Sequence, residues 1–139
     1  MRLLFALVLA ASPAPAQQVP VVHLNAGMHL IRAEVAADYA TRMTGLMHRA
    51  SMPSNAGMLF IFDEATTHCM WMKNTLLPLS VAFIDDSGTI INVEDMAPQT
   101  EDSHCARRAA LYALEMNRGW FAARGIKPGS RIGGIPGAK

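Results

Sequence analysis

Hydrophobic and polar positions divide the chain into short segments, most of them of strand length. Alternating or continuous apolar runs bounded by turn residues predict strands. The predicted strands cover residues 19–24, 29–35, 57–62, 69–74, 79–84, 89–94, 110–116 and 130–135. Because short turns link most of them, the pattern favours a mostly antiparallel barrel-like or sandwich-like fold. We therefore predict a single compact, mainly β (α+β) domain of about six to eight strands with two short helices.

Two segments carry helical signals. Asp38 is predicted to cap a helix that runs to about His48. Apolar residues recur in this segment at helical spacing and are predicted to face the core: Tyr39, Met43, Leu46 and Met47. Asn117 is predicted to cap a second helix that ends near Arg124.

The N-terminus has the pattern of a secretory signal peptide. Arg2 precedes a short apolar run, and small residues then end in the Ala-Pro-Ala of residues 14–16. The run is shorter than the ~20 residues of a membrane-spanning helix. We predict a signal peptide at residues 1–16, an N-terminal extension at 17–27 and a single domain at 28–136.

Composition indicates one folded domain without a strong charge bias. Hydrophobic residues make up 51% of the chain and charged residues 17%, which argues against disorder. Without Arg2, 11 basic side chains balance 11 acidic ones, and no run is rich in Lys or Arg. We expect a periplasmic or secreted protein that binds neither nucleic acid nor, after signal cleavage, a membrane.

The chain has two cysteines, Cys69 and Cys105, which lie 36 residues apart. Oxidising conditions outside the cytosol favour a disulfide between them, which would tie the irregular segment 95–108 to the centre of the chain. Each cysteine follows a histidine, and these His68-Cys69 and His104-Cys105 pairs also supply the ligand set of a zinc or copper site. Adjacent strand residues point to opposite faces, which disfavours that site. We predict the disulfide and no cofactor, with metal binding as the alternative.

A group of polar residues near the centre of the chain is the candidate binding site. Glu115 lies on a predicted strand among apolar neighbours, where a carboxylate is costly unless it is paired. Lys73 is the first predicted partner, followed by Arg42 or Arg49. An aromatic ring beside amide, cationic and acidic groups suits a small polar ligand such as a sugar or a peptide. The candidate residues are Trp71, Lys73, Asn74, Glu115 and Asn117. A structural ion pair that fixes strand register is the competing interpretation.

Five motifs in order resemble a known family. They are RMTGLMHR at 42–49, GMLFIF at 57–62, WMKNT at 71–75, LEMNRGW at 114–120 and GIKPG at 125–129. Together they resemble the bacterial and archaeal domain of unknown function 192, from about residue 32 to residue 132. The resemblance implies a single, often exported, mainly β barrel-like or sandwich-like domain without an established activity. Ser80 and Cys69 depart from the commoner pattern, in which an aspartate and a serine are frequent at these positions.

These features favour a soluble periplasmic accessory or small-ligand-binding module over an enzyme. No serine elbow, zinc-protease motif or phosphate loop occurs in the sequence. The first alternative is a hydrolase-like enzyme that uses Glu115 with His68 or His104. The second is periplasmic copper or zinc handling through the two His-Cys pairs. The expected partner is a small polar ligand or a periplasmic protein.

Overall fold

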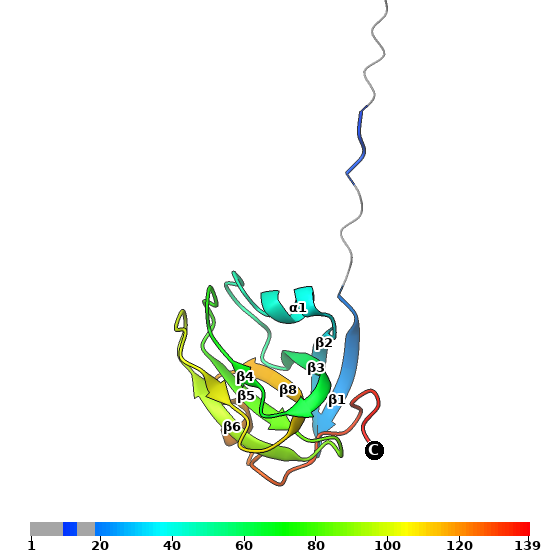
Figure 1. The fold of residues 1–139 in the computed structure, drawn as a ribbon, viewed down its shortest axis with the longest axis vertical. Helices are drawn as coiled ribbons and strands as arrows, with labels where there is room; N and C mark the ends of the chain where they lie inside the picture. The colour runs from blue at the N-terminus through cyan, green and yellow to red at the C-terminus, as the bar shows by residue number, and fades with distance from the viewer. Residues whose placement is uncertain (1–9, 14–18) are drawn as a thin grey trace, which may run out of the picture.

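The computed structural model describes residues 10–13 and 19–139. Most of the predicted signal peptide, at 1–9 and 14–16, lies outside these residues, and so its assignment stays a prediction. The elements, labelled in Figure 1, are β1 Val21–Ala26, β2 His29–Ala36, α1 Tyr39–Thr44, β3 Ala56–Thr66, β4 Cys69–Met70, β5 Leu79–Ile84, β6 Ile90–Met96, β7 His104–Cys105, β8 Ala110–Asn117 and α2 Trp120–Ala123. No helix of the described part of the chain is long and apolar enough to cross a membrane.

Six of the strands form one curved sheet in the order β1-β2-β3-β8-β5-β6 (Figure 1). The β2–β3 pair is parallel, and the other pairs are antiparallel. The strands β4 and β7 form a separate two-stranded ribbon. The predicted mainly β fold is therefore confirmed in its sandwich-like form, with eight strands and two short helices. The larger sheet does not close into a barrel, because β1 and β6 are its edges.

The C-terminal segment predicted as a strand at 130–135 instead links the two sheet edges. Ile90 on β6 donates its N–H to the carbonyl of Ser130 over 2.8 Å, and Asn25 on β1 donates to the carbonyl of Gly133 over 3.1 Å. Only isolated bridges form, because the segment passes from one edge to the other and does not run along either. The strand prediction for this segment is wrong, but its backbone groups still form hydrogen bonds with both edge strands.

The first strand belongs to the sheet. All six residues of β1 are in register with β2, from Val21 opposite Glu34 to Ala26 opposite His29. Leu24 is buried in the core. The structural domain therefore begins with β1, within the predicted extension 17–27.

The alternation of side chains along β8 separates two hydrophobic cores. Leu114 and Met116 pack on one side of the sheet in the core that also contains Trp120 and Phe121. Ala113 faces the other core, which contains Phe60, Val81 and Met72. Glu115, two residues after Ala113, points to the same side as that second core.

The first helix is shorter than predicted, and its predicted core face is wrong. Asp38 caps it as expected, since its carboxylate accepts the Thr41 N–H over 2.8 Å. Helical geometry ends at Gly45, which has a φ of +48°, a conformation that glycine adopts without strain. Tyr39 and Met43 are therefore exposed, at 73% and 44%. Of the four predicted core residues only Leu46, beyond the helix, is buried, whereas Met47 is half-buried.

The second helix also starts differently from the prediction. Asn117 is the last residue of β8, and the helix is capped by Gly119. The Asn117 amide instead donates to the carbonyls of Met52 and Pro53, over 2.9 Å and 3.3 Å. It therefore holds the 51–55 loop against the end of β8.

The predicted strand 69–74 ends after two residues. Beyond β4, Met72 donates its N–H to the carbonyl of Thr100 over 3.0 Å, and Asn74 turns the chain with a φ of +53°. The alternation expected for a strand still holds in part, because Met72 is buried whereas Trp71 and Lys73 are exposed.

The predicted disulfide is present. Cys69 on β4 lies directly opposite Cys105 on β7, and the two are bonded. The amide of Asn92 supports this ribbon by donating to the Cys105 carbonyl over 3.2 Å. The long connection between β6 and β8 is thereby attached to the segment that carries Trp71. Because the bond occupies both sulfurs, the alternative ligand set of His68, Cys69, His104 and Cys105 is wrong for this structure.

Replacing both cysteines by alanine should lower the free energy of unfolding by about 4 kcal/mol, because the bond closes a 36-residue loop in the unfolded chain. Urea denaturation of the wild type and the double variant measures the difference. Reduced wild-type protein serves as the control and should match the variant. Equal midpoints for oxidised protein and variant would show that the bond contributes nothing.

Candidate functional site

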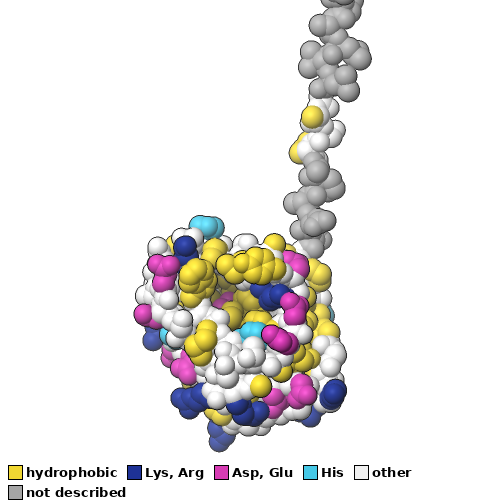
Figure 2. All heavy atoms as spheres, viewed as in Figure 1, with side chains coloured by type: hydrophobic (Ala, Val, Ile, Leu, Met, Phe, Trp, Pro, Cys, Tyr) yellow, Lys and Arg dark blue, Asp and Glu magenta, His cyan; other side chains and the backbone are white. Residues whose placement is uncertain are grey.

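A cavity of about 340 Å³ opens on the side of the sheet that carries Glu115. Figure 2 shows this hollow, rimmed by hydrophobic side chains. Its walls come from α1 and the loop after it, from β3, and from segment 68–75. The lining residues are Tyr39, Arg42, Met43, Thr44, Gly45, Leu46, Met47, Phe60, Phe62, Asp63, Glu64, His68, Cys69, Met70, Trp71, Lys73, Thr75 and Glu115. The volume is at the lower end of the range for small-molecule sites.

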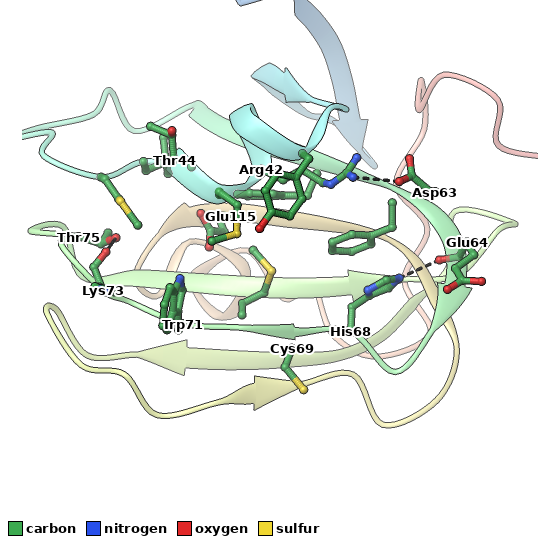
Figure 3. A pocket seen from close by; sticks show the side chains of 18 residues that line it. Arg42, Thr44, Asp63, Glu64, His68, Cys69, Trp71, Lys73, Thr75 and Glu115 are labelled. Atoms are coloured by element: carbon green, nitrogen blue, oxygen red, sulfur yellow. Dashed lines mark hydrogen bonds and ion pairs between the residues drawn. The ribbon is translucent and has the colours of Figure 1, made fainter.

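Glu115 is a buried acidic residue that lines this cavity. In the sheet it is in register with Met58 on β3 and Val81 on β5, so apolar side chains flank it. Its side chain lines the cavity in the middle of the view in Figure 3, and the residue is 4% exposed. Burial raises the pKa of Glu115 from 4.5 to about 8. At neutral pH the carboxyl group is therefore mostly protonated.

The predicted ion pair of Glu115 is wrong. Lys73 lines the same cavity, but the ion pairs of the described residues do not include Glu115. Arg42 binds Asp63 over 3.1 Å and also donates to the carbonyls of Ala37 and Ile61. These contacts hold the Arg42 guanidinium at the wall (Figure 3). The sequence alone does not show that Asp63 and Glu34 bind the two candidate arginines, Arg42 and Arg49.

The other predicted arginine, Arg49, forms two hydrogen bonds with Glu34. The same contact raises the pKa of Arg49. No hydrogen bond from a described residue reaches the Glu115 side chain. A buried carboxyl without a partner is unfavourable for stability, and so the interpretation of Glu115 as half of a structural ion pair fails.

Trp71 and Lys73 lie together at the opening of the cavity. Trp71 is 39% exposed, and the Lys73 Nζ lies 5.2 Å from the centre of its ring. This distance is typical of a cation–π contact. The predicted proximity of Trp71, Lys73 and Glu115 agrees with the cavity lining. Asn74 and Asn117 do not line it: the Asn74 side chain is exposed in the turn, and Asn117 binds the 51–55 loop.

The two histidines of the predicted hydrolase alternative, His68 and His104, differ in position. His68 lines the cavity, stacks on Phe62 with 3.7 Å between ring centres, and its Nε2 lies 2.8 Å from the Glu64 carbonyl oxygen (Figure 3). His104 lies outside the cavity lining, and its Nε2 is buried without a hydrogen-bond partner among the described residues. Only His68 is therefore placed to act with Glu115.

Sequence reasoning missed the aromatic and thioether wall. It is formed by Phe60, Phe62, Met43, Met47 and Met70. Their apolar runs predict core residues, and nothing in the pattern distinguishes a core side chain from one that lines a cavity. The available signal is that motifs 42–49, 57–62 and 71–75, which carry the family resemblance, supply most of the lining.

The unusual Ser80 lies away from the cavity. Its hydroxyl donates to Asp95 over 2.6 Å and accepts the Gly119 N–H over 2.9 Å. It therefore joins β5, β6 and the start of α2. This departure from the commoner family pattern concerns contacts between β5, β6 and the start of α2, and Ser80 does not line the cavity.

The fold and cavity define a class of protein: a small mainly β domain with a cavity of about 340 Å³ that a buried acid lines. A family model described as "Uncharacterized ACR", domain of unknown function 192, matches residues 21–134. The chain belongs to this family, which confirms the resemblance seen in the sequence motifs.

Two solved structures are similar to the chain. One is from Sinorhizobium meliloti 1021 and is described as a "putative transcription regulator". It is 36% identical in sequence, and the match covers 86% of this chain and 97% of the other, with a TM-score of 0.81. The other is a protein of unknown function from Novosphingobium aromaticivorans DSM 12444. It is 31% identical in sequence, and the match covers 88% of this chain and 90% of the other, with a TM-score of 0.76. No curated protein matches the chain.

The substitution Glu115→Gln should remove a pH dependence of stability. The folded pKa of about 8 exceeds the reference value of 4.5, so the folded state binds more protons between these pH values. The wild-type free energy of unfolding should therefore fall as pH rises through this window, by up to about 1.4 kcal/mol per pH unit. Thermal unfolding from pH 5 to pH 9 measures this slope.

The exposed acid Glu64 provides the matched control, since Glu64→Gln should retain the wild-type slope. Parallel curves for the wild type and Glu115→Gln would contradict the assignment of the proton to Glu115.

Proposed function

We propose that the protein is an exported accessory domain that binds a small polar ligand in the Glu115 cavity. One observation carries the proposal: a carboxyl group that is 4% exposed, has no partner among the described residues and lines a cavity of about 340 Å³. Such a group costs stability unless something binds it. A ligand that hydrogen-bonds Glu115 would supply the missing partner.

The opening of the cavity supports the same proposal. Trp71 offers a broad aromatic face that is partly in solvent, and Lys73 lies over it. An aromatic surface combined with a few convergent polar groups is typical of sites that orient small ligands. The Arg42–Asp63 pair adds a fixed polar edge to the wall.

Binding is preferred to hydrolysis as the function. A hydrolase would need Glu115 and His68 to be arranged around a reacting atom, with an activated water or nucleophile between them. Within the described part of the chain no hydrogen bond joins Glu115 to His68, and the His68 Nε2 already contacts the Glu64 carbonyl oxygen. The raised pKa of Glu115 alone does not make it a catalytic group.

Export is the second part of the proposal. The signal-like pattern of residues 1–16 and the Cys69–Cys105 bond support it, because disulfides persist mainly outside the cytosol. Expression of the full chain in a bacterium with a periplasm should yield a protein that starts at Gln17 and lacks free thiols. Intact-mass analysis of the periplasmic and cytosolic fractions measures both. An uncleaved chain confined to the cytosol would contradict export.

The binding function is tested by a thermal-shift screen of small polar molecules with the disulfide-bonded domain. A ligand present at 100 times its Kd should stabilise the protein by about 2.7 kcal/mol. The sequence contains two tryptophans, and Trp120 lies in the opposite core, so a ligand-induced change in fluorescence should come from Trp71.

Variants assign any such signal to the cavity. Trp71→Phe should abolish the fluorescence change. Glu115→Gln should weaken binding by about tenfold, because the ligand loses one hydrogen bond to a charged or strongly polar group. The exposed Glu101, outside the cavity lining, provides the matched control Glu101→Gln, which should bind normally. Hits that bind all variants equally would place the site elsewhere.

A further inference from the structure

The cavity walls indicate the charge of the ligand, an inference that rests on the binding function proposed above. The aromatic rings of Tyr39, Phe60, Phe62 and Trp71 line the cavity. Thioethers of Met43 and Met70 also contribute to the lining. Aromatic faces carry negative potential and thioether sulfur is polarisable, so both groups favour a cation with apolar substituents over an anion.

The basic groups of the cavity offer little to an anion. Arg42 already donates to Asp63 and to the carbonyls of Ala37 and Ile61. Lys73 already contacts the Trp71 ring, with its Nζ 5.2 Å from the ring centre. An anion that entered the cavity could accept a hydrogen bond from Glu115 only while the carboxyl group is protonated, and the ionised group would repel it.

The contact between Lys73 and Trp71 shows that the aromatic face of Trp71 lies within cation–π distance of an ammonium group of this chain. A ligand ammonium can bind beside Glu115, whose ionised form has no counter-charge among the ion pairs of the described residues. From this geometry we propose that the cavity binds an organic ammonium ion with an apolar body. The ammonium group donates hydrogen bonds to the Glu115 carboxylate, and the apolar body contacts Phe60 and the thioethers.

Binding of such a cation releases a proton. Glu115 is mostly protonated at neutral pH, and its carboxyl proton passes to solvent when the ammonium ion takes its place. The titratable or charged side chains that line the cavity with Glu115 come from α1, β3 and the segment around β4: Tyr39, Arg42, Asp63, Glu64, His68 and Lys73. Its neighbours in register, Met58 and Val81, are apolar.

The affinity for a cation should therefore rise with pH. The apparent Kd should fall about tenfold per pH unit below the pKa of Glu115 and level off near pH 8, while an alkylammonium ion stays charged because its own pKa resembles that of lysine. A neutral ligand that accepts a hydrogen bond from the protonated carboxyl group would show the opposite trend.

Three probes of one shape separate these possibilities: hexylammonium, 1-hexanol and hexanoate. Isothermal titration calorimetry of the disulfide-bonded domain at pH 6.0, 7.0 and 8.5 measures each Kd. Buffers of different ionisation enthalpy reveal the proton released. At pH 8.5 hexylammonium should bind about tenfold or more tightly than 1-hexanol, as expected for a charge-assisted hydrogen bond, and hexanoate should bind worst.

The substitution Glu115→Gln keeps the shape of the side chain and removes its charge. It should erase both the preference for hexylammonium and the proton release, while 1-hexanol still binds. The control Glu101→Gln removes a charge from an exposed residue outside the cavity and should retain both. Retention of the ammonium preference in Glu115→Gln would overturn the role assigned to Glu115.

The outcomes distinguish the two proposals. Tighter binding of 1-hexanol or hexanoate than of hexylammonium at pH 8.5 would overturn the cation inference and leave the cavity as a binding site. If none of the three probes binds but the thermal-shift screen finds a neutral or anionic ligand that depends on Trp71, the cation inference alone fails. If neither experiment finds a ligand, both proposals fail.

Discussion

The pairing of β8 with β3 on one side and with β5 on the other is the constraint on which the structure depends. This register places Glu115 between Met58 and Val81, on the fourth strand of the six-stranded sheet. Because strand side chains alternate, shifting β8 by one residue would turn Glu115 into the opposite core, which is filled by large apolar side chains such as Trp120. The position of the buried acid and the packing of both cores therefore depend on the same strand register.

The other elements convert this buried acid into a site. The helix α1 ends at Gly45, and the chain after it forms one wall. The β4–β7 ribbon, closed by the Cys69–Cys105 bond, holds the segment with Trp71 and Lys73 at the opening. A more regular fold would cover Glu115 with apolar side chains, whereas these short elements leave about 340 Å³ beside it.

Sequence patterns predict the strands well, because alternation and apolar runs record which faces are buried. They also predict the disulfide, since the two cysteines follow an N-terminal pattern that predicts export, and disulfides form in oxidising compartments. They fail at α1, where Tyr39 and Met43 follow helical spacing but are exposed, because the chain leaves the helix before that face is completed. They also fail at the end of the chain, where 130–133 bridges two sheet edges.

For the site, the sequence identifies Glu115, Trp71 and Lys73 but not how they are related. A buried acid among apolar residues is visible in the pattern of β8. That none of the described residues pairs with it depends on the tertiary structure, in which Arg42 binds Asp63 and Arg49 binds Glu34. Asn74 and Asn117 are polar residues beside the same motifs, yet they serve a turn and a loop. Local patterns record burial, but they do not record which of several possible partners the tertiary structure selects.

The most direct measurement of the central claim is an NMR titration of the Glu115 side-chain carboxyl carbon, assigned by comparison with Glu115→Gln. A buried carboxyl group without a partner predicts a midpoint near pH 8 in the free protein. A midpoint near the ordinary value of 4.5 would show that Glu115 is solvated or paired, and would contradict the account.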